Sequence, residues 1–297
     1  MIDMVRRAAV VFVFVVCVLH GVLVAQTAQS LISNPEWVRA FPPFRMIGTI
    51  YWIGTYDLST YLITTPQGHI VINTGLAQTV GQIAANVQQL GFKVEDIKIL
   101  TATHGHFDHV AGLAQLKSLT KAQMVMSEQD APLLESGGKT DFRWGADPDA
   151  NFEPVKVDRT LKDGDTIKLG GVVLTAHHHP GHTKGATSFT LNVTEGGKTY
   201  RVGIMNMGSI NPGVTLRGMP TYPTIGDDYA RTFREQTALT IDVFLASHAS
   251  QFRMHDKYKP GDAYQVDRFV DPAGYRAGVD DLEMTYRTQM AQESSAR

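Results

Sequence analysis

Four residues with metal-ligating side chains occur within six consecutive positions: His104, His106, Asp108 and His109. Zinc binds imidazole nitrogen and carboxylate oxygen at about 2.0–2.2 Å, in tetrahedral or slightly expanded geometry. Four such groups so close in sequence cannot all bind one ion without severe backbone strain, but they divide easily between two ions. The pattern therefore predicts a site for two metal ions.

Two later histidines complete this set of ligands. His182 lies in Pro180-Gly-His-Thr183, where proline and glycine favour a sharp turn. His248 lies in Ala246-Ser-His-Ala249, directly after an apolar segment. With the first four residues they form two sets of three ligands, each of which leaves a position for water. An open position is typical of catalytic rather than structural zinc sites.

Strands and helices must bring these residues together. Residue types and hydrophobic periodicity predict strands at 48–54, 59–64, 69–73, 97–103, 166–169, 172–176, 187–193, 200–205 and 241–246. Helices are predicted at 80–90, 111–119 and 228–237. Each histidine-bearing segment follows a strand, and ligands bind at the carboxyl ends of strands in open α/β sheets. We therefore expect one domain with one shared site.

Residues 136–158 interrupt this succession of predicted strands and helices. The segment is polar, contains glycines and prolines, and carries three aromatic residues, Phe142, Trp144 and Phe152. Long loops in compact domains are usually functional or mobile. Two interpretations stay open: a surface excursion whose aromatic rings pack onto the core, and a flap over the site.

The first thirty residues differ from the rest of the chain. Arg6 and Arg7 precede an apolar run from Ala8 to Ala25, and polar residues follow. This is the pattern of a secretory signal peptide. We expect cleavage after Ala25, with Ala28 as the alternative site. An uncleaved membrane anchor is the competing interpretation.

Composition restricts the partners and the chemistry. The chain has 297 residues, 43% of them hydrophobic, and a formal net charge of -2, which predicts a globular protein without a nucleic-acid partner. Its one cysteine, Cys17, lies in the apolar run, so residues 26–297 offer no thiolate. We expect a periplasmic or secreted monomer that has no contact with the membrane once the signal is removed.

The motifs around the histidines resemble the metallo-β-lactamase superfamily. The resemblance extends from Pro42 to Phe252 and is strongest to the third subclass of class B metallo-β-lactamases, through segments 54–63, 72–75 and 246–252. It implies an α/β (α+β) fold, a four-layer αβ/βα sandwich with the metals in a cleft at one edge. Residues 26–297 would form this single hydrolase domain.

The resemblance also implies roles for individual residues. It assigns a first Zn²⁺ to His104, His106 and His182, and a second Zn²⁺ to Asp108, His109 and His248. Ser209 and Asn211 lie in Gly208-Ser-Ile-Asn211, which resembles the loop that contacts the carboxylate of the antibiotic. Asn73 stands where many superfamily members carry Asp.

The implied activity is hydrolysis of the β-lactam ring of penicillins, cephalosporins and carbapenems, which confers antibiotic resistance. Bound zinc makes hydroxide available at neutral pH, and Asp108 would orient this hydroxide. No covalent acyl-enzyme is expected, because no serine or cysteine nucleophile motif accompanies the site. A lactonase, a glyoxalase II-like thioesterase and a non-catalytic zinc-binding protein are the alternatives. Lactonases and glyoxalase II-like thioesterases typically carry an Asp that bridges both metals, on the strand after the Pro-Gly-His turn. In this chain that region is Gly203–Ser209, which has no carboxylate, and this favours the β-lactamase.

Overall fold

A computed structural model describes residues 34–295 of the chain. The chain divides into two units, Met1–Pro35 and Glu36–Arg297, and every strand that the structure describes belongs to the second. The predicted signal peptide, residues 1–25, lies outside the described residues. Within the described part, no helix is both long and apolar enough to cross a membrane.

The first sheet of this unit has seven strands, whose spatial order follows the sequence. They are β1 (Phe44–Ile47), β2 (Ile50–Trp52), β3 (Tyr61–Thr65), β4 (Gly68–Ile72), β5 (Ile97–Thr101), β6 (Gln123–Ser127) and β7 (Arg159–Leu161). The first four strands pair antiparallel, and β4 to β7 pair parallel. Thr65 pairs with Gly68 across the β3–β4 turn, so Pro66 and Gln67 form the tight turn of a β-hairpin.

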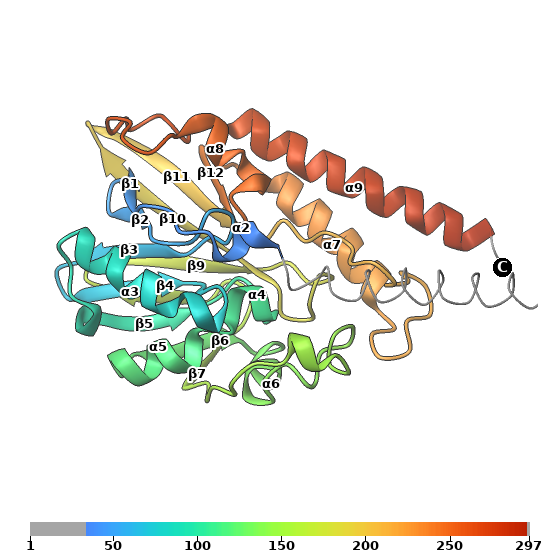
Figure 1. The fold of residues 1–297 in the computed structure, drawn as a ribbon. Helices are drawn as coiled ribbons and strands as arrows, with labels where there is room; N and C mark the ends of the chain where they lie inside the picture. Colours follow the sequence, from blue (N-terminus) through green and yellow to red (C-terminus); the bar gives the residue numbers. More distant parts are fainter. Residues whose placement is uncertain (1–33, 296–297) are drawn as a thin grey trace, which may run out of the picture. The chain divides into compact units, whose positions relative to one another are not determined.

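The second sheet has five strands in the order β12-β11-β10-β9-β8. They are β8 (Thr166–Leu169), β9 (Val172–His178), β10 (Thr187–Glu195), β11 (Lys198–Met205) and β12 (Val243–Ala246). The described α-helices are α2 (Pro35–Val38), α3 (Val80–Gln89), α4 (Phe107–Val110), α5 (Leu113–Thr120), α6 (Ala131–Glu135), α7 (Ile225–Ala238), α8 (Met254–Lys257) and α9 (Pro272–Ser295). Figure 1 shows α7 and α9 together, on the side away from α3 and α5.

Alternating side chains of the first sheet build two separate cores, because successive residues of a strand point to opposite faces. Leu62 and Val71 pack with the α3 and α5 side chains, such as Val87. Tyr61 and Ile72 belong instead to the core shared with the second sheet. Residues of α7 and α9 join that larger core. The result is the predicted four-layer αβ/βα sandwich.

Several described elements were not predicted from the sequence, among them β6, β7 and α9. Four consecutive residues of β6 are buried and two of the three residues of β7 are exposed, so neither strand shows a clear alternation. Helix α9 has 24 residues and packs on α7 and β12. The side of α9 that faces the core carries apolar residues at helical spacing, a pattern that the sequence contains. These residues belong to the core or pack against it: Tyr275, Val279, Leu282, Tyr286 and Met290.

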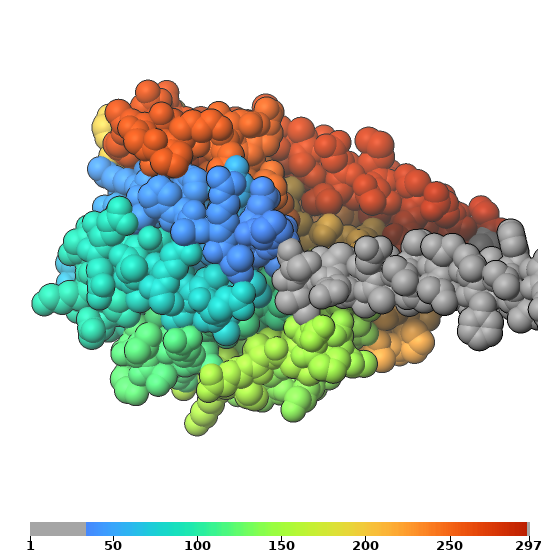
Figure 2. All heavy atoms as spheres, viewed as in Figure 1, coloured from blue at the N-terminus to red at the C-terminus, as the bar shows by residue number. Residues whose placement is uncertain are grey.

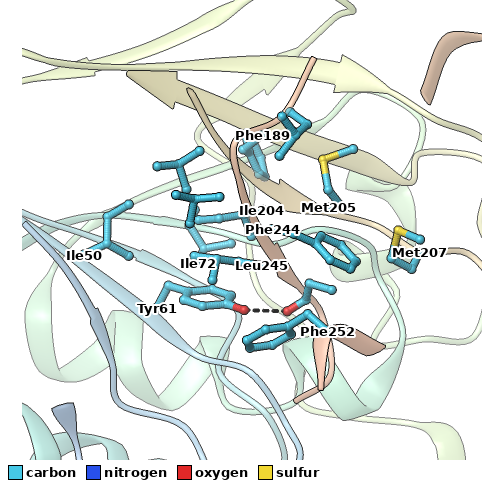
Figure 3. Close-up of a cluster of buried hydrophobic side chains, with 14 of the residues drawn as sticks. Ile50, Tyr61, Ile72, Phe189, Ile204, Met205, Met207, Phe244, Leu245 and Phe252 are labelled. Carbon is cyan, nitrogen blue, oxygen red and sulfur yellow. Dashed lines mark hydrogen bonds between the residues drawn. The ribbon is translucent and has the colours of Figure 1, made fainter. Parts of the chain in front are cut away.

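A hydrogen bond from Tyr61 joins the two sheets close to one of the histidine loops. The buried Tyr61 hydroxyl donates to the carbonyl oxygen of Ala246, the last residue of β12, over 2.6 Å. Figure 3 shows this bond among the apolar side chains of the larger core. It holds the end of β12 two residues before His248.

We expect Tyr61→Phe to lower the free energy of unfolding by about 1–3 kcal/mol, because the Ala246 carbonyl stays buried without its donor. Chemical denaturation of the two proteins measures this difference. Tyr51→Phe is the matched control, since the Tyr51 side chain is only half-buried and packs through its ring on Phe92. Equal losses in both variants would contradict the inter-sheet role of the Tyr61 hydroxyl.

Candidate metal centre

The segment 104–109 follows the carboxyl end of β5, an interior strand of the first sheet, and runs into α4. All four predicted ligands in it have buried side chains. Asn73 supports the segment from below: its amide oxygen accepts from the backbone N–H of Thr103 over 2.9 Å. Asn73 has a φ of 64°, a conformation that asparagine tolerates better than most residues. Asn73 therefore provides an oxygen acceptor for the backbone directly before the first histidine.

The turn at Pro180-Gly-His fixes His182. Gly181 has a φ of +132°, and a Cβ atom there would lie 2.7 Å from Cγ of the Tyr229 ring, so only glycine fits. The Nδ1 atom of His182 lies 2.6 Å from the carbonyl oxygen of Ser209. Because a carbonyl can only accept, Nδ1 carries the proton and Nε2 keeps its lone pair.

His248 is positioned by the loop that connects β2 and β3. Leu58 forms an isolated β-bridge with His248, and Ser59 N–H donates to Ser247 O over 3.1 Å. Figure 2 shows blue atoms from the start of the described chain beside orange atoms from the residues after β12. From this loop, Asp57 Oδ2 lies 2.9 Å from His248 Nδ1. That contact directs Nε2 of His248 away from Asp57.

The structure brings together all six residues that the sequence predicts as ligands. One group of side chains has its ligand atoms within 4.8 Å of one another: His104, His106 and His182. A second group meets the same limit: His104, Asp108 and His109. His248 joins the second group, since its Nε2 lies 3.2 Å from His109 Nε2 and 3.4 Å from Asp108 Oδ2.

The donor atoms suit cations. His106 Nδ1 lies 3.1 Å from His182 Nε2, and His109 Nε2 lies 3.2 Å from His248 Nε2. His104 Nε2 is buried without a hydrogen-bond partner. Burying imidazole nitrogens that face one another, or one that has no partner, lowers the stability of the fold unless a bound cation accepts their lone pairs. These residues therefore fit bound metal.

The electrostatics keep most ligands in their metal-binding protonation state. Burial lowers the pKa of His104 well below its usual range and that of His182 to about 3, so both are neutral. Burial raises the pKa of Asp108, but contacts with His109 and His248 outweigh it and hold that pKa well below its usual range.

His106 and His248 are the exceptions, because carboxylates lie beside both. Burial lowers the pKa of His106, but its contact with Asp141 outweighs burial and raises that pKa. Asp57 and Asp108 flank His248. Burial lowers its pKa, but Asp108 and Asp57 outweigh burial and raise the pKa to about 9. Since a metal ligand must be deprotonated, binding of a cation at His248 releases a proton.

Three carboxylates that hold the ligands in place were missed by the sequence analysis: Asp57, Asp130 and Asp141. Asp130 is 1% exposed and joins two ligand segments, since it accepts from Gly105 N–H, the Thr183 hydroxyl and Gly185 N–H over 2.7–2.9 Å. Asp141 Oδ2 lies 3.3 Å from His106 Nε2. These acids lie 25 to 191 positions from their partners, and no local pattern marks them.

We expect Asp57→Asn to weaken binding of the metal at His248 by about 10- to 100-fold, the usual effect of removing a carboxylate that orients a ligating histidine. Titration of metal-free protein with zinc, followed by calorimetry, measures both binding events. The matched control is Asp256→Asn, a side chain that is 63% exposed and pairs only with Arg253 among the described ion pairs. Unchanged affinity in Asp57→Asn would contradict the orienting role.

The segment 136–158 lies beside the centre, because Asp141 contacts His106. Its aromatic side chains also pack inward, as the surface interpretation expected: Trp144 is buried, and Phe142 and Phe152 pack against the cores. Ser209 is exposed next to His182, to which its carbonyl is bonded. Asn211 is half-buried and bonds through its backbone carbonyl to Val214 N–H.

Comparison with known proteins agrees with this geometry. The family model described as the metallo-β-lactamase superfamily matches residues 54–195. The structure of a β-lactamase from Chitinophaga pinensis is 46% identical in sequence, with a TM-score of 0.85, and covers 88% of this chain and 98% of that chain. The chain belongs to the metallo-β-lactamase superfamily. Within the superfamily it is a hydrolase whose histidine-rich centre is suited to metal.

Solved structures and curated sequences point to different members of the superfamily. The class B3 di-zinc metallo-β-lactamase LRA-12 from an Alaskan soil metagenome is 44% identical, with a TM-score of 0.84 over 86% of this chain and 97% of that chain. A hydroxyacylglutathione hydrolase of Rhodopseudomonas palustris is 27% identical over 132 residues, 44% of this chain. The chain spans only 35–42% of the length of such curated relatives.

Proposed function

We propose that this protein is a di-zinc β-lactamase that hydrolyses penicillins, cephalosporins and carbapenems and thereby confers antibiotic resistance. The observation that carries the proposal is the convergence of six histidine and aspartate side chains, with no bridging carboxylate among residues 34–295. The similarity over almost the full length of class B3 structures supports it.

Three histidines would hold the first zinc ion: His104, His106 and His182. The second would be held by Asp108, His109 and His248. Bound zinc would supply a nucleophile at neutral pH and stabilise developing negative charge. The donors match the preferences of zinc, which binds histidine and carboxylate readily.

The side chains around the zinc sites orient the reactants. One water is consumed: its oxygen bonds to the lactam carbonyl carbon, the C–N bond of the ring breaks, and the nitrogen gains a proton. Asp108 is the catalytic residue that orients the attacking water, since its carboxylate is ionised and lies among the ligand nitrogens. Ser209 and Asn211 would bind the carboxylate of the substrate from the loop after β11.

The thioester hydrolases of the superfamily are the competing class. The segment after β11 separates the two classes, because a carboxylate bridging both metals would come from there. Here Asn206 occupies that segment, is 2% exposed and donates through its side-chain amide to Thr103 O over 3.3 Å. A buried amide engaged with the backbone is no substitute for an anionic bridging ligand.

A spectrophotometric panel on the zinc-loaded protein tests the proposal. The substrates are a penicillin, a cephalosporin, a carbapenem, a lactone and a glutathione thioester. We expect ring opening of the three β-lactams with kcat/KM at least a hundredfold above the values for the lactone and thioester. Preferential turnover of the thioester or lactone would overturn the β-lactamase assignment and leave the superfamily assignment intact.

We further propose that the protein acts as a monomer in the periplasm or outside the cell. The signal-like pattern of residues 1–25 supports export, and the absence of cysteine from residues 26–297 suits an oxidising compartment. Amino-terminal sequencing of protein recovered from the periplasmic fraction should begin at Gln26. Recovery of an uncleaved chain from the membrane fraction would favour the anchor.

A further inference from the structure

We infer that Arg143 is a positioning residue that clamps together two loops beside the metal centre. We name these the Asp141 loop (residues 136–158) and the Ser209 loop (residues 206–224, between β11 and α7). The clamp itself is a property of the fold, and its effect on substrate binding rests on the proposed function.

The Arg143 side chain crosses from one loop to the other. Its Nε donates to the carbonyl oxygen of Pro212 over 2.7 Å, and its guanidinium lies 4.0 Å from the centre of the Trp144 ring. Two weaker contacts join the same loops: the Thr221 hydroxyl donates to Phe142 O over 3.3 Å, and the Phe142 ring packs edge-on against Tyr222. The guanidinium therefore makes the shortest polar link between the loops.

The backbone around Arg143 is anchored to the metal centre. The N–H groups of Arg143 and Trp144 donate to Asp141 Oδ1 over 2.7 and 2.6 Å, while Asp141 Oδ2 faces His106. Asp141 therefore fixes the Asp141 loop to a predicted zinc ligand. The Arg143 side chain extends that fixed point to Pro212, three residues beyond Ser209 and next to Asn211.

The Ser209 loop needs such an external anchor. Before α7 it contains no helix or strand, and it includes Gly208, Gly213 and Gly218. Its start is held at Ser209 O by His182 and by the Tyr229 hydroxyl, over 2.6 and 2.8 Å. From Val214 on, α9 holds the loop, since Gln289 donates to Val214 O and Glu293 accepts from the backbone N–H groups of residues 216 and 217, over 2.7–2.9 Å. Between these anchors, the Arg143–Pro212 bond ties residues 210–213 to the Asp141 loop. Without it, Asn211 and the Ser209 hydroxyl would sample a wider range of positions.

Arginine suits this role better than lysine. Its planar guanidinium can stack on an aromatic ring and donate in its own plane at once, whereas an ammonium is a point charge on a flexible stem. No ion pair among residues 34–295 includes Arg143. Its charge is therefore directed at a carbonyl and a ring, as expected for a residue that fixes the backbone.

Arg143→Ala, Arg143→Lys and the control Arg287→Ala test the clamp. Arg287 is 74% exposed and pairs with Glu283 on α9. Hydrogen–deuterium exchange of the zinc-loaded full chain, read on peptides covering residues 206–224, is the first measurement. We expect about tenfold faster exchange in both Arg143 variants, and wild-type exchange in Arg287→Ala.

Steady-state kinetics with a β-lactam is the second measurement. Both Arg143 variants should raise KM about tenfold and leave kcat and zinc content near wild-type values, because the Asp141–His106 contact is made without the Arg143 side chain. Full rescue of KM by lysine would overturn the clamp in favour of direct attraction between the charge and the substrate.

Unchanged exchange of residues 206–224 in Arg143→Ala would also overturn the clamp. Failure of the proposed function gives a different result. Wild-type protein would then show no β-lactam hydrolysis, yet exchange of the Ser209 loop would still accelerate in the variants, which supports the clamp alone.

Discussion

Replacing Asp108 with alanine is expected to lower kcat by about 10²- to 10⁴-fold, the range associated with a positioned group that acts on a proton or nucleophile in the transition state. Its carboxylate lies 3.2 Å from His109 Nε2 and 3.4 Å from His248 Nε2. The variant therefore loses both a ligand and the group that orients the attacking water. KM should change far less than kcat, because the lost interaction is specific to the transition state.

Ser209→Ala provides the contrast to Asp108→Ala. Ser209 is proposed to contact the substrate carboxylate, which is present in ground state and transition state alike. Its loss should act on KM, by about 1.5–3 kcal/mol for a hydrogen bond to a charged group. A collapse of kcat with unchanged KM in Ser209→Ala would contradict the loop assignment. Full kcat in Asp108→Ala with both zinc ions bound would contradict the orienting role of Asp108.

Removal of metal is expected to abolish hydrolysis. Prolonged dialysis against a chelator should reduce the rate to background, and addition of two equivalents of zinc should restore it, because the proposed mechanism depends on zinc to supply the nucleophile. Elemental analysis should give two zinc ions per chain after dialysis against micromolar zinc. Activity that survives complete removal of zinc would contradict the whole mechanism, and one ion per chain would contradict the second site.

Two reagent controls sharpen the chelation experiment. Inhibitors that acylate a serine nucleophile should leave hydrolysis intact, because the mechanism forms no acyl-enzyme. Thiol-alkylating reagents should also have no effect on mature protein, since Cys17 is the single cysteine of the chain and lies in the predicted signal. Inhibition by either reagent would indicate a covalent mechanism.

The six candidate ligands could be picked out from the sequence because the pattern that marks them is local. Four of them fall within residues 104–109, and His182 follows a proline–glycine turn. The carboxylates that support them could not be predicted in the same way. Asp57 contacts His248 across 191 positions, and only the strand order brings the two loops together. A solitary aspartate in a loop has many uses, so its residue type alone indicates none of them.

Secondary structure shows the same division between local and distant causes. Strands such as β8 match their predicted bounds, because alternation and flanking turns are visible in a few residues. Strand β7 depends on a parallel neighbour instead: Arg159 pairs with Val125 of β6. Its three residues carry no pattern of their own. Pairing with a distant strand is a tertiary effect that a single-sequence pattern does not contain.

The origin of the ligands in both sheets has a consequence for folding. His106 and His182 are separated by 76 positions, and His109 and His248 by 139. Closing such long loops is entropically unfavourable, so the unfolded chain would bind zinc far more weakly than the docked sandwich. If the proposed zinc sites are correct, each tenfold rise in free zinc above the dissociation constant adds about 1.4 kcal/mol per site to the apparent stability. The folded fraction of the protein would then depend on the free zinc concentration around it.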